Sequence, residues 1–282
     1  MVEARDDTLH HGWMTVASEF GPLLQANSLD SFEKVMALSG GKIVRNFPGR
    51  RTVRLELKTA GGASQGVYLK RYETGYLSAG RRLLRFLRWP GAQDEALREW
   101  EMIQRVRSIG IQTATRIAVG QENSGGMVRR SFLMTAEIVG AIEGHTYAQR
   151  LRAPERGRLL LGVAEMAQRF HQAGFVHKDY YVGHVLVRPT SGEPELFLID
   201  LQRVVQPCCF RARWVAKDLG ALAYSTLKAG ATRAELLRAY LAYCAKPALG
   251  APEKRTARRV LGRVAWLRTR RPKHDGPFKP LA

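Results

Sequence analysis

Residues 175–204 read FVHKDYYVGHVLVRPTSGEPELFLIDLQRV, and this stretch spaces three polar side chains around short apolar runs. Asp179 follows an apolar turn, His184 comes five residues later, and Asp200 ends the apolar run 197–199. A carboxylate on a loop can orient a hydroxyl group and accept its proton. A carboxylate at the end of a short strand can reach a metal ion, and Mg²⁺ prefers hard oxygen ligands. The order of these side chains therefore predicts a site for phosphoryl transfer.

Protein kinases use the same order, with a catalytic loop H-R-D-x-x-x-x-N and a metal-binding D-F-G. His177, Lys178 and Asp179 fill the first three positions of that pattern, and Asp200 fills the last. His184 stands where an asparagine is expected. We therefore predict that Asp179 is the catalytic base and that Asp200 and His184 are metal ligands, with a hydrogen bond to the phosphate as the alternative role of the His184 imidazole. The alternative is that each aspartate only caps a turn or ends a strand beside one of the 45 Lys and Arg residues, but the ordered set favours a site.

A lysine and a helical glutamate precede this motif in the order that kinases use. Residues 67–70, VYLK, indicate a strand ending in Lys70, the position of the lysine that holds the ATP α- and β-phosphates. Residues 97–110, LREWEMIQRVRSIG, place apolar side chains at helical spacing and end in a glycine. We predict that Glu99 on this helix pairs with Lys70, with Glu95 and Glu101 as alternatives. Without the downstream motif, these charges would be interpreted as ordinary surface residues.

The segment expected to cover the phosphates is poor in glycine. Residues 40–58, GGKIVRNFPGRRTVRLELK, predict two strands joined by a hairpin turn at residues 47–50. A protein kinase would carry G-x-G-x-x-G here, so fewer backbone N–H groups can bind the phosphates. We predict that Arg50 or Arg51 compensates with positive charge. The alternative is a plain hairpin with exposed arginines.

Residues 129–144, RRSFLMTAEIVGAIEG, indicate a strand that ends in polar residues, at the place where kinases bind adenine through the backbone of a hinge. We expect Met134 behind the adenine and main-chain contacts from Glu137 and Ile138. The next run, residues 156–175, predicts an amphipathic helix that carries His171 in its last turn. A histidine there is more often a satisfied core or surface residue than a catalytic one.

Four runs of the chain resemble the bacterial lipopolysaccharide kinase family: LREWEMIQRVRSIGIQT, HKDYYVGHVLV, LFLIDLQRV and RWVAKDLGALAYST, within residues 40 to 245. His184 and the D-L-x-R that begins at Asp200 resemble the pattern of this family rather than that of protein kinases. The resemblance implies that Asp218 is a structural aspartate that steadies the catalytic loop, with His177 as a further structural support.

The resemblance also implies a fold and a reaction. The fold is α+β and bilobal, protein-kinase-like, with a small N-lobe of antiparallel sheet and one main helix and a larger, mainly helical C-lobe. The reaction uses ATP and Mg²⁺ and phosphorylates a hydroxyl of an inner-core sugar, either heptose or 3-deoxy-octulosonic acid. The implied acceptor is lipopolysaccharide core or lipid A-core.

The length and composition fit one bilobal domain. A chain of 282 residues that is 45% hydrophobic can bury a full core. We divide it into an N-terminal extension, an N-lobe, a C-lobe and a basic C-terminal tail, at residues 1–40, 41–138, 139–250 and 251–282. Its three cysteines lack metal-ligand spacing, so reduced thiols are expected.

No run reaches the roughly 20 apolar residues that span a bilayer, and the N-terminus MVEARDDTLHHGW lacks the basic and apolar regions of a signal peptide. We therefore expect a cytoplasmic protein, peripheral at the inner face of the inner membrane.

The formal net charge of +20 requires an anionic partner or a tolerance for self-repulsion. Residues 77–90 mix four arginines with leucine, phenylalanine and tryptophan, the composition of a basic amphipathic helix at a membrane surface, or of a packed helix with a solvated basic face. The basic tail has the charge to contact anionic lipid or phosphate. We predict an anionic membrane surface as a partner and expect no nucleic acid, because no nucleic-acid-binding motif accompanies the charge.

Three other functions stay open. A kinase of this fold can act on a protein or on a soluble small molecule such as an aminoglycoside. A catalytically inactive kinase-like binding protein is favoured by the single-glycine hairpin and by His184. A nucleic-acid-binding protein is favoured by the net charge alone.

Overall fold

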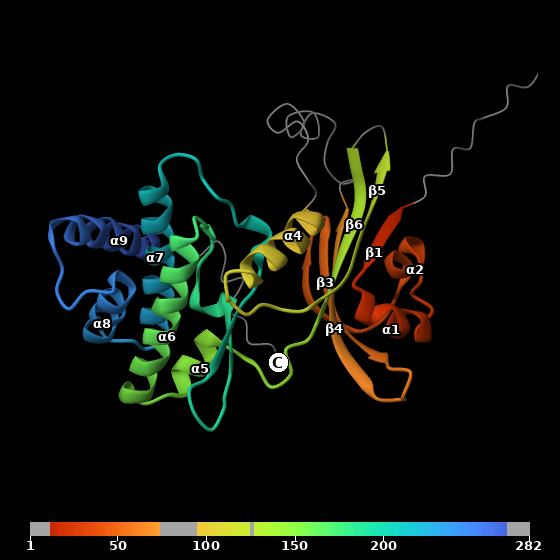
Figure 1. Cartoon of the computed structure of the whole chain (residues 1–282), viewed down its shortest axis with the longest axis horizontal. Coiled ribbons are helices and arrows are strands. Elements are labelled where there is room, and N and C mark those ends of the chain that lie inside the picture. The colour runs from red at the N-terminus through yellow and green to blue at the C-terminus, as the bar shows by residue number, and fades with distance from the viewer. Residues whose placement is uncertain (1–11, 74–94, 125–126, 270–282) are drawn as a thin grey trace, which may run out of the picture. The chain divides into compact units, whose positions relative to one another are not determined.

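The computed structural model describes residues 12–73, 95–124 and 127–269 (Figure 1). The chain divides into two compact units. The first unit comprises Met1–Glu101 and Thr115–Glu137, and the second comprises Met102–Ala114 and Ile138–Ala282. The predicted basic helix at residues 77–90 lies outside the described residues.

A six-stranded antiparallel sheet forms the body of the first unit, in the order β1-β5-β6-β4-β3-β2. Its strands are β1 (Trp13–Val16), β2 (Lys42–Phe47), β3 (Arg50–Lys58), β4 (Ser64–Glu73), β5 (Arg116–Ser124) and β6 (Met127–Ala136). Along β3, Val53, Leu55 and Leu57 are buried in alternation with charged residues, as the two-residue period of a strand requires. The predicted hairpin is confirmed, because Phe47 pairs with Arg50 across a turn in which Gly49 has φ 75°.

Helices α1 (Gly21–Ala26) and α2 (Phe32–Ala37), with the 3₁₀ turn η1 (Ser18–Phe20), pack on this sheet (Figure 1). Leu23, Leu24 and Val35 bury their side chains among those of the sheet, and the Phe32 and Phe132 rings lie 5.7 Å apart. Residues 12–40, which fall in the predicted N-terminal extension, therefore contribute a strand and two helices to the core of the first unit. Helix α4 (Glu95–Arg107) has its first two turns in this unit and continues into the second.

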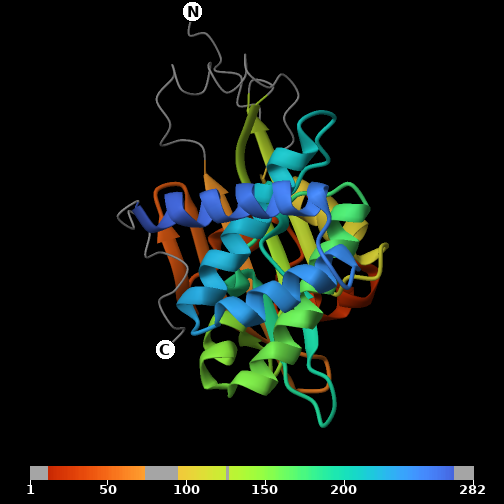
Figure 2. The same ribbon diagram turned by 90° about the vertical axis from the view of Figure 1, so that its left-hand side faces the viewer.

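The second unit is mainly helical and carries one small antiparallel sheet. Its helices are α5 (Gly144–Arg150), α6 (Ala153–Gln172), α7 (Arg211–Lys228), α8 (Arg233–Cys244) and α9 (Ala251–Thr269). Its strands are β7 (Ile142–Glu143), β8 (Val185–Arg188) and β9 (Glu195–Leu198), and its 3₁₀ turns are η2 (Val182–His184) and η3 (Leu201–Arg203). Helix α6 packs on α8, and α7 packs on α9. Figure 2 turns these helices toward the viewer, with α9 in the darkest blue.

Residues 102–114 belong to the second unit, although the sequence analysis placed them in the N-lobe. The backbone explains this assignment, because Leu198 N–H donates to Gln112 C=O at 2.8 Å and extends the small sheet. Arg105 also bonds to Gln206.

The described part of the predicted basic tail, residues 251–269, forms the regular helix α9. Val260 is buried in a cluster with Ala216 and Leu219 of α7, and Val264, four residues later, is also buried. This burial explains why so charged a segment packs on α7. Within the described ranges, no helix combines the length and the hydropathy that a membrane crossing requires.

Candidate active site

The two halves of the predicted catalytic motif are tied together by the backbone of the second unit. Val176 and Val205 exchange N–H···O=C bonds of 2.9 and 3.0 Å as an isolated bridge, so the segment entering the loop runs beside the segment that follows Asp200. Ile199 N–H donates to His184 C=O at 3.0 Å. These bonds place Asp179 and Asp200 on neighbouring segments, although the two residues are 21 positions apart along the chain.

Two non-glycine residues of this motif have left-handed backbone conformations. Lys178 has φ 68°, and Asp200 has φ 62° and ψ 49°. Such angles are uncommon outside glycine and persist only where the surrounding structure imposes them. Lys178 directly precedes the predicted base and Asp200 is the predicted metal ligand, which fits a strained functional loop.

Asp179 presents a partly accessible carboxylate. Its side chain is 29% exposed and forms an ion pair with the guanidinium of Arg203. Arg203 belongs to the D-L-x-R segment, but the sequence analysis gave it no role because ion pairs between distant positions leave no local pattern. The carboxylate is therefore both reachable by a hydroxyl group and held by a cation.

His184 is fixed through one of its ring nitrogens. Nδ1 lies 2.7 Å from the backbone carbonyl oxygen of Asp179, which is only an acceptor, so Nδ1 carries the hydrogen. In the neutral ring this leaves the lone pair on Nε2, which lies 3.7 Å from Asp200 Oδ2. Both side chains are largely buried. A lone pair and a carboxylate facing each other at this distance favour a cation between them.

The pair of His184 and Asp200 fits an ion that receives most of its ligands from elsewhere. Among the described residues, no group of three or more His, Cys, Asp or Glu residues can hold a metal ion. Mg²⁺ in phosphoryl-transfer sites is commonly bound by one or two carboxylates together with waters and substrate phosphates. An imidazole ligand is less usual for Mg²⁺, since imidazole suits softer metals.

His177 and Asp218 form a buried support beneath the loop. Asp218 Oδ2 accepts the backbone N–H of His177 at 2.6 Å, and the two residues are 1% and 0% exposed respectively. His177 Nε2 donates to the carbonyl of Ile199 at 3.1 Å, next to Asp200. His177 also stacks on His184, with ring centroids 5.7 Å apart. Ser225 Oγ accepts from Val182 N–H at 2.9 Å, a contact that the sequence analysis missed.

Lys70 and Glu99 form an ion pair in the first unit. Lys70 Nζ lies 2.6 Å from Oε1 and 2.9 Å from Oε2 of Glu99, and the two side chains are 15% and 4% exposed. Strand β4 carries the lysine and α4 carries the glutamate. Arg116 lies over the Trp100 ring at 4.3 Å and donates to its carbonyl, which fixes the turn of α4 that bears Glu99.

The predicted adenine-binding segment has an ion pair that the sequence analysis missed. The Glu137 carboxylate accepts two hydrogen bonds of 2.7 Å from Arg54, and this carboxylate raises the pKa of the Arg54 guanidinium. A Cβ added at Gly66 would lie 1.9 Å from Glu137 Oε2, so the carboxylate paired with Arg54 would have to move. Met134 is fully buried in β6, and Ile138 C=O accepts from Ala141 N–H at 3.1 Å in the second unit.

Arg50 begins β3, and its guanidinium lies 5.5 Å from the centre of the Tyr72 ring. Its half-buried position differs from that of Arg51, which is exposed on the same strand. The structure thus holds Arg50 against the sheet and leaves Arg51 toward solvent.

Basic side chains gather around Asp179 in the second unit. Lys178 and Lys217 both place their ammonium groups over the Trp214 ring, at 5.4 and 5.1 Å. Burial, followed by the charges of nearby arginines including Arg203, lowers the pKa of Lys217, which also senses the charge of Asp179. This arrangement suits an anionic ligand near the predicted base.

A comparison with protein families covers the whole candidate site. Residues 35–243 match the sequence model of the lipopolysaccharide kinase (Kdo/WaaP) family. This span contains every candidate site residue from Arg50 to Asp218.

Individual relatives cover most of the chain. Lipopolysaccharide core heptose(I) kinase WaaP of Pseudomonas aeruginosa is 32% identical over 252 residues, which are 86% of this chain and 88% of that protein. The protein of the same name from Escherichia coli is 31% identical over 227 residues, covering 77% and 83%. A solved structure of WaaP in complex with acyl carrier protein matches 91% of this chain and 96% of that one, with 30% identity and a TM-score of 0.66. The predicted protein-kinase-like fold is confirmed.

Proposed function

The chain belongs to the lipopolysaccharide kinase (Kdo/WaaP) family, and from this premise we propose that it transfers the γ-phosphoryl group of ATP to a hydroxyl of a lipopolysaccharide inner-core sugar. The names of the relatives support heptose as the acceptor over 3-deoxy-octulosonic acid. One observation carries the proposal: a partly exposed Asp179 carboxylate whose backbone is tied, through His184, to the segment that ends in Asp200.

Asp179 is the proposed general base. Its carboxylate accepts the proton of the acceptor hydroxyl while the hydroxyl oxygen bonds to the γ-phosphorus, and the bond from that phosphorus to the β–γ bridging oxygen breaks. ADP leaves with the bridging oxygen. The Arg203 guanidinium orients the carboxylate. His177 and Asp218 keep the loop backbone in place.

Asp200 and His184 are the proposed protein ligands of Mg²⁺. A bound divalent cation would neutralise charge on the phosphates of ATP. The Nδ1–H bond from His184 to the Asp179 carbonyl directs its Nε2 lone pair toward Asp200, which supports this assignment.

Lys70 is the proposed ligand of the ATP phosphates, and Glu99 orients it. A buried ammonium group held by a carboxylate is a preorganised point charge for a phosphate oxygen. Glu137 and Ile138 are proposed to offer main-chain groups to adenine, and Arg50 to add charge near the phosphates.

The acceptor is proposed to be anionic. Lys178, Lys217 and Arg203 surround Asp179, and a phosphorylated or carboxylated sugar core would pair with them. This charge is a specific reason to prefer such an acceptor over a neutral soluble molecule.

We propose that the protein works at the cytoplasmic face of the inner membrane, with α9 as one contact. Its exposed positions include Arg255, Arg258 and Arg259, flanked by exposed Leu261 and Trp266. Basic side chains beside exposed apolar ones bind anionic bilayers. Sedimentation with vesicles of neutral or partly anionic lipid tests this contact. The double change of Arg258 and Arg259 to glutamate should abolish sedimentation with the anionic vesicles, and unchanged sedimentation contradicts it.

A relative solved in complex with acyl carrier protein supports a protein partner too. We propose that this chain binds acyl carrier protein. Gel filtration of the two purified proteins together tests this, and elution of both at their separate volumes contradicts it.

The function is tested with purified protein, ATP, Mg²⁺ and a panel of acceptors: dephosphorylated lipopolysaccharide core, a generic protein substrate and an aminoglycoside. A core mass raised by one phosphate group, with the other acceptors unchanged, supports the proposal. Phosphate on one of the other acceptors alone points to the alternative kinases. No transfer and no thermal shift with Mg-ATP points to a binding protein instead.

A further inference from the structure

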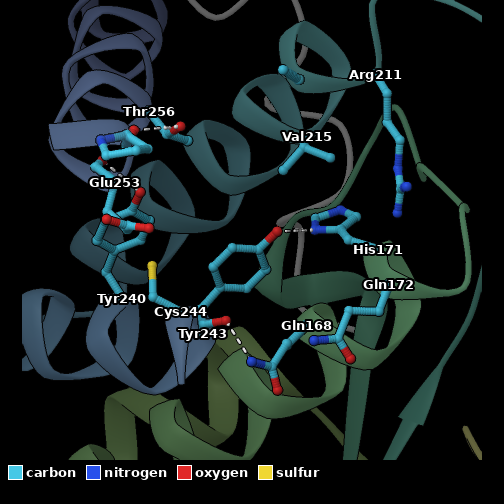
Figure 3. A pocket seen from close by; sticks show the side chains of 12 residues that line it. Gln168, His171, Gln172, Arg211, Val215, Tyr240, Tyr243, Cys244, Glu253 and Thr256 are labelled. Carbon is cyan, nitrogen blue, oxygen red and sulfur yellow. Dashed lines mark hydrogen bonds between the residues drawn. The ribbon is translucent and has the colours of Figure 1, made fainter. Parts of the chain in front are cut away.

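Helices α6, α7, α8 and α9 of the second unit line an open pocket of about 430 Å³ (Figure 3). Its wall includes the stacked rings of Tyr240 and Tyr243, whose centroids lie 6.1 Å apart with an angle of 11° between the planes. His171 lines the same pocket but is only 3% exposed. Figure 3 shows the Tyr243 ring reaching from α8 toward this imidazole.

The contacts of His171 define its tautomer. Tyr243 Oη lies 3.0 Å from His171 Nδ1. Burial raises the pKa of the Tyr243 phenol, so its hydroxyl keeps its hydrogen. The opposite ring nitrogen faces the Asp218 carboxylate, which can only accept, so the hydroxyl donates to Nδ1. The other nitrogen, Nε2, then carries the hydrogen of the neutral ring, and it lies 3.5 Å from Asp218 Oδ2. The tyrosine therefore makes the imidazole point its N–H at a buried carboxylate.

That carboxylate is the one that supports the catalytic loop. Asp218 Oδ2 also accepts the backbone N–H of His177 at 2.6 Å, two residues before Asp179. Asp218 is 1% exposed, and its Oδ1 is buried without a hydrogen-bond partner. The free-energy cost of burying a carboxylate with so few donors rises strongly when any one of them is removed. His171 Nε2 lies 3.5 Å from Asp218 Oδ2, longer than a normal hydrogen bond, so this contact is a close electrostatic one between an imidazole N–H and a buried carboxylate.

We propose that Tyr243 and His171 are positioning residues that hold the catalytic loop through Asp218. The relay runs from the Tyr243 hydroxyl through the imidazole and the carboxylate to the His177 amide, and it links α8 to the loop that bears the proposed base. The predicted effect of this relay on kcat rests on the proposed kinase activity, whereas its contacts do not. Neither residue touches ATP or acceptor in this assignment.

The chain supplies a matched pair of variants. Tyr243→Phe removes the hydroxyl that fixes the tautomer and leaves the ring in place. Tyr240→Phe makes the same change in the same wall of the pocket, where the hydroxyl donates to Glu253 C=O at 2.9 Å and takes no part in the relay. Both are compared with wild type in the full-length protein.

We expect Tyr243→Phe to lower kcat by about threefold to tenfold, the effect of one modest hydrogen bond, with the KM for ATP unchanged. Tyr240→Phe should keep the wild-type kcat. In His171→Gln the amide N–H₂ can still donate to Asp218, so its kcat should exceed that of His171→Phe. Equal kcat values for Tyr243→Phe and Tyr240→Phe overturn the proposal. A lower kcat in Tyr243→Phe that is fully explained by a smaller fraction of folded protein overturns it too.

A second readout needs no activity. In ¹⁵N spectra of the imidazoles, wild-type His171 should show a bare Nδ1 and a protonated Nε2. Tyr243→Phe should mix the two tautomers and speed hydrogen exchange at the His177 amide, whereas Tyr240→Phe should not. An unchanged tautomer and unchanged exchange in Tyr243→Phe contradict the relay. If wild type transfers no phosphate but these signatures appear, the proposed function fails while the relay stands.

Discussion

Replacing Glu99 by glutamine tests the buried ion pair of the first unit most sharply. The change keeps the shape of the side chain but leaves the Lys70 ammonium facing an amide in place of the carboxylate that it now contacts at 2.6 and 2.9 Å. The Lys70 side chain is 15% exposed. Breaking a buried pair by neutralising one partner costs about 3–5 kcal/mol. Because Lys70 retains some solvent and the glutamine can still accept one hydrogen bond, we expect a loss of about 3 kcal/mol in the free energy of unfolding.

Urea denaturation followed by circular dichroism measures this loss. With an m-value of about 2 kcal/mol per molar, the midpoint should fall by about 1.5 M. Glu195→Gln is the matched control, because it breaks an exposed pair with Arg188 and should leave the midpoint nearly unchanged. The double variant of Lys70→Met with Glu99→Gln should be more stable than the sum of the single losses, because no unpaired charge is then buried. A midpoint for Glu99→Gln equal to that of the control refutes the reasoning.

Three further changes have expected outcomes. Asp200→Asn should abolish Mg²⁺-dependent transfer in a radiolabelled ATP assay while ATP still binds by calorimetry, and full transfer would exclude Asp200 as a ligand. Gly66→Ala should lower the melting temperature, because its Cβ would lie 1.9 Å from Glu137 Oε2 and displace that carboxylate; a wild-type melting temperature contradicts the predicted clash. Burial and neighbouring arginines lower the pKa of Lys217, so in the folded protein this side chain loses its proton at a pH below the ordinary lysine pKa of about 10.4. Just below that pH the folded protein therefore binds fewer protons than the unfolded chain. Stability therefore gains from Lys217 as pH rises toward that value, while the KM for an anionic acceptor should rise over the same range and stay flatter in Lys217→Arg.

Local patterns in the sequence were sufficient to predict the short segments that carry Asp179 and Asp200. The spacing from Asp179 to Asp200 is set by a loop and one hairpin of the second unit, so it is visible along the chain. The partner of Lys70 was also predictable, because helical periodicity fixes which side of α4 is buried and the chemistry of the lysine requires a carboxylate there.

Pairs between distant positions were not predictable. Arg54 and Glu137 are 83 residues apart, and His171 and Tyr243 are 72 apart. Many arginines and tyrosines were available for each partner, and only the packing of strands and helices selects one. Helix α9 was missed for a different reason. Charged residues dominate its composition, so the two valines whose burial packs the helix did not stand out in the sequence.

The central claim is that Asp179 takes the proton of a core-sugar hydroxyl during transfer from ATP. The direct measurement is the initial rate of ³²P transfer from ATP to dephosphorylated lipopolysaccharide core, for wild type and Asp179→Asn at equal concentrations of folded protein. Removing a general base costs about 10²–10⁴-fold in rate, so the variant should be slower by at least about 10²-fold while its affinity for ATP is unchanged. A rate for Asp179→Asn within a few fold of wild type would contradict the account.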